Sequence, residues 1–490
     1  MIDTQALRNK ILYLAMHGIL TEQLPEDGTS GDLLLQIQNI KEQILSERKV
    51  KRESNENNEI TEFPFTLPKS WRWIRLCDLG SFSGGKTPSM NNSENWKEGT
   101  IPWITSKDMK QKYLYSSEMM VSKRGAQELT IYPPNTVLFV VRSGILRRLF
   151  PVAILKTNGT INQDLKALTL YLPDMCEYIY YVLKGFEPTI LYKYTKDGTT
   201  VNNIIFDDLL SMPIPLPPYA EQRRIVEKIE QAFSILDTID ELQSQYADNL
   251  SALKSKLIDS AIQGKLTEQL PEDGTAEELY QQIQEEKQAL IKAGKIKKEK
   301  PLPEIKDEDM PFEIPRNWKW FRFATISIII RTGLIRSRGE QYDKAEYYYF
   351  KMNNIGNFDG KCHFENMEMV NASIEEYDRY VLEKGDFLFN TRNSKELVGK
   401  AATVPEITQK ILFNNNILKV RFGEGVLSEY ITYYFISSQG RSLLSRLSTS
   451  TTNVAAIYQR QLEVIPIPLP PLAEQKRIVE KLDEVLSCLG

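Results

Sequence analysis

Apolar side chains recur at alternating four- and three-residue spacing in the middle of the chain. No proline or glycine stands between Ala220 and Gln263, and this pattern predicts a coiled-coil helix about 65 Å long. Pro217 and Pro218 precede the helix and Gly264 follows it, which sets its two ends. One interpretation is a stalk for oligomerisation, and the alternative is a helix pair within one chain. The residues at this spacing would form the seam along which the helices of a coiled coil pack, and all of them except Gln243 are apolar or aromatic. They are Ile225, Ile229, Ala232, Leu236, Ile239, Gln243, Tyr246, Leu250, Leu253 and Leu257.

Two blocks outside this helix have a different pattern. Residues 60–212 and 311–465 contain short β-branched and aromatic runs, such as 136–141 and 386–389, separated by Gly, Asn and Pro turns. Such runs are typical of strands. We therefore expect two mixed α+β domains rich in strand.

The chain also contains two internal repeats. LTEQLPEDGT occurs at 20–29 and again at 266–275, and PIPLPPYAEQRRIVEKI at 213–229 reappears as PIPLPPLAEQKRIVEKL at 466–482. The two offsets, 246 and 253 residues, place both chain ends inside one interrupted copy of the long helix. A repeat of this length indicates two similar halves. We expect residues 2–17 and 473–489 to supply the second helix of an antiparallel pair, with the termini close together and an approximate two-fold axis.

The predicted fold class is thus α+β, with two similar mixed α/β domains joined by long antiparallel coiled-coil helices in a circular, pseudo-two-fold arrangement. The polar stretches 46–59 and 292–309 are interpreted as solvated linkers. The predicted segments are 1–59 (part of the distal helical region plus linker), 60–212 (first variable block), 213–310 (central helical region and linker), 311–465 (second variable block) and 466–490 (rest of the distal helical region).

Composition excludes several classes of protein. With 61 Lys and Arg against 65 Asp and Glu, the chain is no polycation. Its four cysteines are far apart and it has two histidines, which argues against disulfide scaffolds, common zinc sites and histidine-based catalysis. No apolar run approaches the ~20 residues of a membrane span. We expect a cytoplasmic multidomain protein without a metal site.

Two motifs resemble catalytic signatures without their context. Residues 80–87, GSFSGGKT, match the phosphate-loop pattern, but Pro88 and turn residues follow where a helix is needed. LPPY at 216–219 resembles the NPPY motif of adenine methyltransferases, but Leu216 replaces the residue that would bind the amine. We expect no catalytic centre, and an NTPase using 80–87 remains a rival hypothesis.

Positive charge is concentrated in the variable blocks. Residues 101–200 carry 13 Lys and Arg against 8 Asp and Glu, and residues 316–351 carry 8 against 3. Basic side chains interleaved with Asn, Gln, Ser and Tyr suit phosphate contacts and base-edge readout. The variable blocks are therefore the candidate DNA-binding surfaces, although some of these charges belong to an ordinary solvated face.

The order of these motifs resembles the specificity subunits of type I restriction–modification systems, over essentially the whole chain. The first block has LPKSWRWIRL (67–76), GGKTPS (84–89), IPWITSKDM (101–109), FVVRSG (139–144), INQDLKAL (161–168) and TTVNNI (199–204). In the second block YYYFKMNNIGNFDG (347–360), LFNTRNS (388–394) and FNNNILKV (413–420) take corresponding places, but the GGxTP turn is missing.

The resemblance implies a function. Each block would be a target-recognition domain reading one half of a bipartite, asymmetric DNA target, and the helices would fix the spacer and dock the modification subunits. Two modification and two restriction subunits are the expected partners, with S-adenosylmethionine, ATP and Mg²⁺ on those partners and no cofactor on this chain. The alternative is a stand-alone DNA-bridging protein without enzymatic partners.

The candidate residues follow from the motifs. The expected DNA contacts are Gly84, Gly85, Lys86, Thr87, Thr105, Ser106, Lys107, Arg142, Arg331, Arg336, Arg338, Asn353, Asn354 and Arg392. The glycines would let the backbone approach phosphate, the arginines suit guanine and the asparagines adenine. The expected docking residues on the conserved helices are Glu221, Arg224, Glu474 and Arg477. We expect the tryptophans at 71, 73, 318 and 320 to be core residues.

Overall fold

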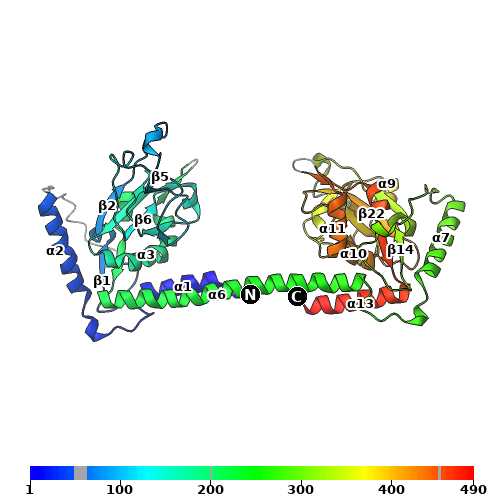
Figure 1. The fold of residues 1–490 in the computed structure, drawn as a ribbon, viewed down its shortest axis with the longest axis horizontal. Helices are drawn as coiled ribbons and strands as arrows, with labels where there is room; N and C mark the ends of the chain where they lie inside the picture. The colour runs from blue at the N-terminus through cyan, green and yellow to red at the C-terminus, as the bar shows by residue number, and fades with distance from the viewer. Residues whose placement is uncertain (49–62, 199–200, 299, 451–453, 490) are drawn as a thin grey trace. The chain divides into compact units, whose positions relative to one another are not determined.

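The computed structural model describes residues 1–48, 63–198, 201–298, 300–450 and 454–489 (Figure 1). The chain divides into two compact units, Met1–Ser244 and Gln245–Gly490. These are called unit 1 and unit 2 below, and each is described by itself.

Unit 1 is built on a five-stranded sheet. Its strand order is β2 (Gly80–Gly84), β10 (Leu165–Leu170), β6 (Thr136–Val140), β8 (Val152–Leu155) and β4 (Tyr113–Leu114), antiparallel except for the parallel pair β4·β8. Every residue of β6 and β8 is buried, which matches their apolar composition. Helix α3 (Cys176–Gly185) packs against β6 and β8 and closes the core. The sheet therefore holds the ends of β2 and β6 in fixed positions.

Smaller sheets lie around this frame. β3 (Ile101–Ile104) pairs with β9 (Thr160–Ile161) in parallel and with β5 (Met120–Val121) antiparallel, and β12 (Asn202–Ile204) pairs with both β11 (Thr195–Lys196) and β7 (Arg142–Ser143). β1 (Arg72–Arg75) pairs with β13 (Pro213–Leu216) and joins the two borders of the block. The short helices α4 (Glu187–Lys193) and α5 (Phe206–Leu210) complete the block.

Unit 2 repeats this plan. Its main sheet has the order β15 (Ser327–Thr332), β22 (Ile417–Phe422), β18 (Phe387–Asn390) and β20 (Ala401–Thr403), all antiparallel. β16 (Tyr347–Phe350) pairs in parallel with β21 (Ile411–Phe413) and antiparallel with β17 (Glu368–Val370). β24 (Ala455–Ala456) lies between β19 (Arg392–Asn393) and β23 (Thr449–Ser450), and β14 (Lys319–Arg322) pairs with β25 (Pro466–Leu469). Apart from β4, which has no counterpart among the described strands of unit 2, the two units share one strand arrangement, in line with the prediction of two similar mixed α/β domains.

Helices complete unit 2. α10 (Ser428–Ile436) packs on β20 and β18 and is followed by α11 (Ser438–Leu447). The shorter helices are α8 (Phe323–Ile326), α9 (Ile374–Tyr380) and α12 (Gln459–Glu463). Trp71, Trp318 and Trp320 are buried in the cores, as expected, whereas Trp73 is half-buried and packs against the core of unit 1.

The predicted long helix is α6 (Tyr219–Ile262), and both ends of the chain pack on it (Figure 1). In unit 1, Arg8 of α1 (Thr4–Met16) forms ion pairs of 2.8 and 2.7 Å with Asp237 and Asp240. In unit 2, α13 (Leu472–Cys488) shares a core cluster with Ile258 and Ile262. The two segments predicted to complete the helix pair therefore do pack on α6.

The predicted seam is buried only toward its N-terminal end. Ile225, Ile229 and Leu236 are at most 5% exposed, but Tyr246 is 65% and Leu253 45% exposed. The heptad spacing alone could not show this difference, because α1 and α13 each cover only one part of α6.

The sequence did not predict helices α2 (Ser30–Arg48) and α7 (Ala276–Lys292). A capping box, in which Thr275 and Glu278 exchange hydrogen bonds, starts α7. The described residues of the predicted solvated linker 292–309 are mostly exposed, but its C-terminal end is anchored to unit 2. There the guanidinium of Arg322 donates to the carbonyls of Pro303 and Glu304 and pairs with Asp309 at 2.7 Å. The predicted linker 46–59 lies largely outside the described residues.

Candidate nucleic-acid interface

Three predicted DNA-contacting loops of unit 1 converge on one turn, residues 161–164, which follows β9. The backbone N–H of Lys86 donates to Ile161 O at 3.1 Å, and the N–H of Arg142 donates to Asp164 O at 3.3 Å. The N–H of Asn162 donates to Ile104 O at 3.0 Å, at the end of the strand that leads to Thr105. The loops after β2, β3 and β6 therefore form one surface, which the sequence could propose only as separate motifs.

Gly85 is required by this convergence. A Cβ at this position would lie 2.0 Å from Ile161 O and 2.4 Å from Asn162 O. At Gly84 the nearest atom to such a Cβ is Nζ of Lys166, at 3.2 Å. Glycine is therefore needed here for packing against the protein's own backbone, and the approach of a phosphate to this backbone stays a prediction.

The predicted contact residues on this surface differ in the exposure of their side chains and in the hydrogen bonds that these side chains form. Lys86, Lys107 and Arg142 are exposed, and within the described parts of the chain none of their side chains forms a hydrogen bond or ion pair. Ser106 is half-buried. Thr87 donates to Gln163, and Thr105 donates to Asp108 at 2.8 Å. The cations are thus available to a ligand, whereas both threonine hydroxyls are engaged.

Sequence reasoning missed two exposed residues on this surface. Gln163 lies on the central turn, and Asn203 of β12 is the direct strand neighbour of Arg142. Both residues belong to motifs that the sequence analysis singled out, Gln163 to INQDLKAL and Asn203 to TTVNNI. Only the strand pairing, however, shows that Asn203 stands beside Arg142.

Unit 2 contains the same strand-end arrangement. The N–H of Leu334 donates to Phe413 O at 2.8 Å, and a Cβ on Gly333 would lie 2.4 Å from the carbonyl oxygens of Phe413 and Asn414. Gly333 in unit 2 therefore allows the same close crossing of two backbone segments as Gly85 in unit 1, although it does not belong to a GGxTP motif. Arg392 is exposed at the start of β19, as Arg142 is at the start of β7.

Asn354 corrects one predicted contact. It is 3% exposed, its Oδ1 accepts the N–H of Lys351 at 2.9 Å, and its Nδ2 donates to His363 O. Asp108 caps the equivalent turn in unit 1, where its Oδ2 accepts the N–H of Thr105 at 2.8 Å. Asn354 is therefore a turn cap and cannot read adenine, whereas its neighbour Asn353 is exposed.

The three arginines predicted as DNA contacts near β15 also differ in exposure and in the contacts that they make. Arg336 is engaged within the block, since it pairs with Glu376 at 2.7 Å and donates to Asn371 O. Arg331 is half-buried and donates to Arg379 O, and burial lowers its pKa from the usual value. Arg338 is exposed. Of the three, Arg338 has the most exposed side chain, and its contact with DNA stays a prediction.

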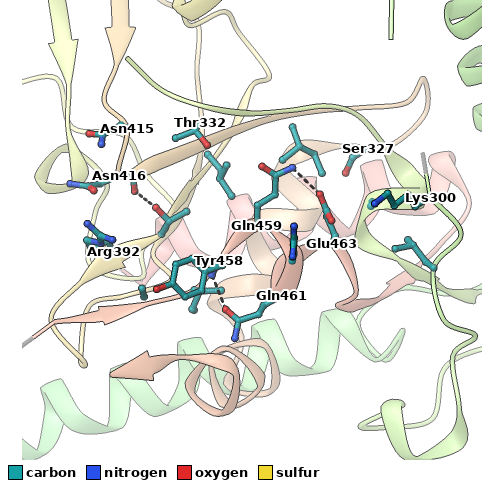
Figure 2. A pocket seen from close by; sticks show the side chains of 18 of the residues that line it. Lys300, Ser327, Thr332, Arg392, Asn415, Asn416, Tyr458, Gln459, Gln461 and Glu463 are labelled. Carbon is teal, nitrogen blue, oxygen red and sulfur yellow. Dashed lines mark hydrogen bonds between the residues drawn. The ribbon is translucent and has the colours of Figure 1, made fainter. Parts of the chain in front are cut away.

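An open pocket of about 1260 Å³ lies beside Arg392. Figure 2 shows Arg392 and Asn416 on one side of it and Lys300 on the other, with Gln459 and Glu463 between them. The walls come from β15, β19, the 415–416 turn, α12 and the segment before β14. This places residues of the former linker on the same surface as a predicted DNA contact.

The four predicted docking residues form two equivalent hydrogen-bond networks inside the protein, one in each unit. These networks, each built on one glutamate and one arginine, are called clamps below. Glu221 is fully buried and accepts hydrogen bonds from Trp71 Nε1 at 2.8 Å, Gln23 Nε2 at 2.9 Å and Thr21 Oγ1 at 3.1 Å. Arg224 binds both carboxylate oxygens of Asp27. Glu474 makes the same contacts with Trp318, Gln269 and Thr267, and Arg477 binds both carboxylate oxygens of Asp273.

These clamps explain the repeated decapeptide. Thr21, Gln23 and Asp27 belong to the first LTEQLPEDGT, and the second copy supplies the same three residue types. The hydrogen bonds from Arg224 and Arg477 lower the pKa of Asp27 and Asp273, respectively. Glu221 and Glu474 are inside the subunit, so the prediction that they contact a partner is wrong.

The phosphate-loop match at residues 80–87 does not have the structure of a nucleotide-binding loop. Residues 80–84 form strand β2, and the chain after Thr87 turns without the helix that a phosphate loop needs. Among the described residues, no group of His, Cys, Asp and Glu is placed to hold a metal ion. In the same part of the chain, no helix has the length and apolar character to cross a bilayer.

Comparison with known proteins gives a consistent result. The model of the type I restriction modification DNA specificity domain matches residues 68–245 and 315–489. The specificity subunit of the type I restriction enzyme EcoAI from Escherichia coli is 26% identical, over 98% of this chain and 88% of its own length. The EcoEI specificity subunit, also from Escherichia coli, is 24% identical over the same shares. A chain from a solved type I R-M system has the same fold, with a TM-score of 0.57, 18% identity and coverage of 87% of this chain and 92% of its own.

Proposed function

The chain belongs to the family of type I restriction modification DNA specificity subunits, and we propose that each of its two units reads one half of a bipartite, asymmetric DNA target. As a member of this family it supplies DNA sequence specificity within a multisubunit complex. The enzymatic activities of that complex are carried by the other subunits. A stand-alone DNA-bridging role and an NTPase role are not favoured.

The repeated strand-end arrangement carries the proposal. Gly85 and Gly333 fix the same loop crossing in the two units, so one backbone frame is presented twice. The side chains on that frame differ, since the exposed Asn203 stands beside Arg142 in unit 1 and the buried Ala456 beside Arg392 in unit 2. Base edges are distinguished by the donors and acceptors opposite them. The same frame with different side chains therefore suits two different half-sites.

The helices are proposed to set the spacer and to dock the modification subunits. Several large apolar side chains on α6 are exposed: Ile235 by 63%, Leu242 by 58% and Tyr246 by 65%. Exposed apolar stripes on a helix are typical of protein–protein contacts. These residues replace Glu221 and Arg224 as the proposed contacts. We propose two modification and two restriction subunits as partners, with S-adenosylmethionine, ATP and Mg²⁺ bound there.

Binding of half-site variants tests the proposal. We expect R142A to weaken binding of the assembled complex by roughly 1–3 kcal/mol, because a bidentate arginine–guanine contact is worth about that much. The loss should shrink on a target whose first half-site is scrambled, whereas R392A should show the same behaviour with the second half-site. Melting transitions like that of the wild type would show that both variants fold. If both variants respond to the same half-site, the assignment of one half-site to each unit is wrong.

A further inference from the structure

The pocket beside Arg392 is strongly cationic. Glu463 is the one carboxylate among its described lining residues, and Gln459 Nε2 donates to it at 2.8 Å. Cations face it from three separate parts of unit 2: the 297–300 segment, β19 and α12. They are Lys297, Lys298, Lys300, Arg392 and Arg460.

These cations are free to bind a ligand. All five are exposed, and within the described chain none forms an ion pair or a side-chain hydrogen bond. By contrast, Arg331 and Arg336 on the same unit are bound to carbonyls or to a carboxylate of their own block. A concentration of unpaired positive charge around an open, polar pocket favours an anionic ligand.

The lysines are held near the pocket by a buried arginine. Arg322, 8% exposed, binds the carbonyls of Pro303 and Glu304 and the carboxylate of Asp309. Leu302, one residue before this anchored stretch, lines the pocket together with Lys300. The segment that the sequence predicted to be a solvated linker is thus fixed to the block at its C-terminal end.

The charge of α12 is specific to unit 2. α5 occupies in unit 1 the place that α12 occupies in unit 2, since each follows the strand paired with the exposed arginine and precedes the PIPLPP segment. At the position of Arg460 unit 1 has Asp207, and at that of Gln461 it has Asp208. The fold accommodates either sign of charge at this position, so Arg460 is not needed for folding.

We infer that this pocket binds backbone phosphates of the DNA next to the half-site read by unit 2, with Lys298, Lys300 and Arg460 as positioning residues. The inference rests on the proposed function. Lysine is a compact point charge that suits phosphate without selecting a base, and phosphate contacts fix register on the duplex. Because Arg392 lies in the same wall, phosphates held in the pocket would place base edges within its reach.

The test is the salt dependence of DNA binding by the complex of the full chain with its modification subunits. The probes are a duplex with the intact target and one with both half-sites scrambled. Each phosphate contact contributes about 0.9 to the slope of log K against log salt. We expect K298Q/K300Q to reduce the magnitude of that slope by about 2 and R460D, which copies unit 1, by at least about 1. Binding should weaken equally on both duplexes, because phosphates carry no sequence information.

The matched control is K384Q/K410Q, which removes the same charge at the opposite ends of strands β18 and β21. It should leave the slope unchanged. Slopes of K298Q/K300Q and R460D equal to that of the wild type, with target preference intact, would overturn this inference alone. No preference of the wild-type complex for the intact target would overturn the proposed function itself.

Discussion

At the scale of single residues, the two buried glutamates organise the entry to each unit. Glu221 and Glu474 are each 0% exposed, and each accepts a hydrogen bond from a buried tryptophan and two from the repeated decapeptide. A buried carboxylate is tolerated only when its oxygens are satisfied. The same acceptor in each unit therefore explains why the threonine and the glutamine of the decapeptide are repeated.

Removing one of these acceptors should destabilise its unit. We expect E221A to lower the free energy of unfolding by about 3 kcal/mol, because the Trp71 N–H would be left in the core without a partner. Urea unfolding of the full chain measures the loss, and E474A should give a similar one. E227A, exposed on the same helix, is the control and should stay within about 0.5 kcal/mol of the wild type. An E221A variant as stable as the control would contradict the clamp.

The paired glycines of unit 1 provide a second residue-scale prediction. G85A should reduce both stability and DNA binding, because its Cβ would collide with the backbone at Ile161 and Asn162. G84A should be tolerated, since the atom nearest its Cβ is the end of the flexible Lys166 side chain. Thermal melting and binding titration of both variants measure the difference. Equal behaviour of the two would show that the loop crossing is not as tight as described.

The sequence predicted which segments form the surface but not which side chains are free. Lys86, Lys107, Arg142 and Arg392 are exposed where the motifs placed them. Asn354 was misjudged, since motif position alone cannot distinguish an asparagine that caps a turn from one that faces solvent. Gly333 was missed because its function depends on a crossing strand 80 residues away in sequence.

At the scale of elements, α6 was the most predictable part of the fold. Its observed bounds, Tyr219–Ile262, differ by one residue from the prediction at each end, because prolines before and a glycine after it act locally. The strand runs were also recognisable, but their pairing was not, since pairing depends on contacts far apart in sequence. Helices α2 and α7 were missed because their residues are largely polar.

Lengthening α6 tests its proposed role as a spacer. A seven-residue insertion after Ser244 keeps the heptad phase and adds about 10.5 Å, close to three base pairs. It spares both packing regions, because α1 bonds to α6 as far as Gln243 and α13 packs near Ile258. We expect the unread spacer of the methylated target to grow by about three base pairs. A same-length replacement of 244–250 is the control, and an unchanged spacer in the insertion variant would refute the ruler role.

At the scale of the whole molecule, the chain presents one backbone frame twice with different exposed chemistry. The two units share the order of four strands in the main sheet, the strand-end crossings and the clamps, whereas the residues beside Arg142 and Arg392 differ. The repeats in the sequence were sufficient to predict this duplication. The difference in charge between α5 and α12 could be read from the sequence. The structure adds that α12 lines a pocket together with Arg392.

The most direct test is long-read methylome sequencing of a host that expresses this chain with its modification and restriction partners. It should be compared with a host lacking the chain and with one in which residues 311–465 are exchanged for those of a relative with different specificity. We predict a bipartite N6-methyladenine motif that disappears without the chain and changes in one half only after the exchange. A motif that persists without the chain, or that changes in both halves after the exchange, would contradict the assignment of one half-site to each unit.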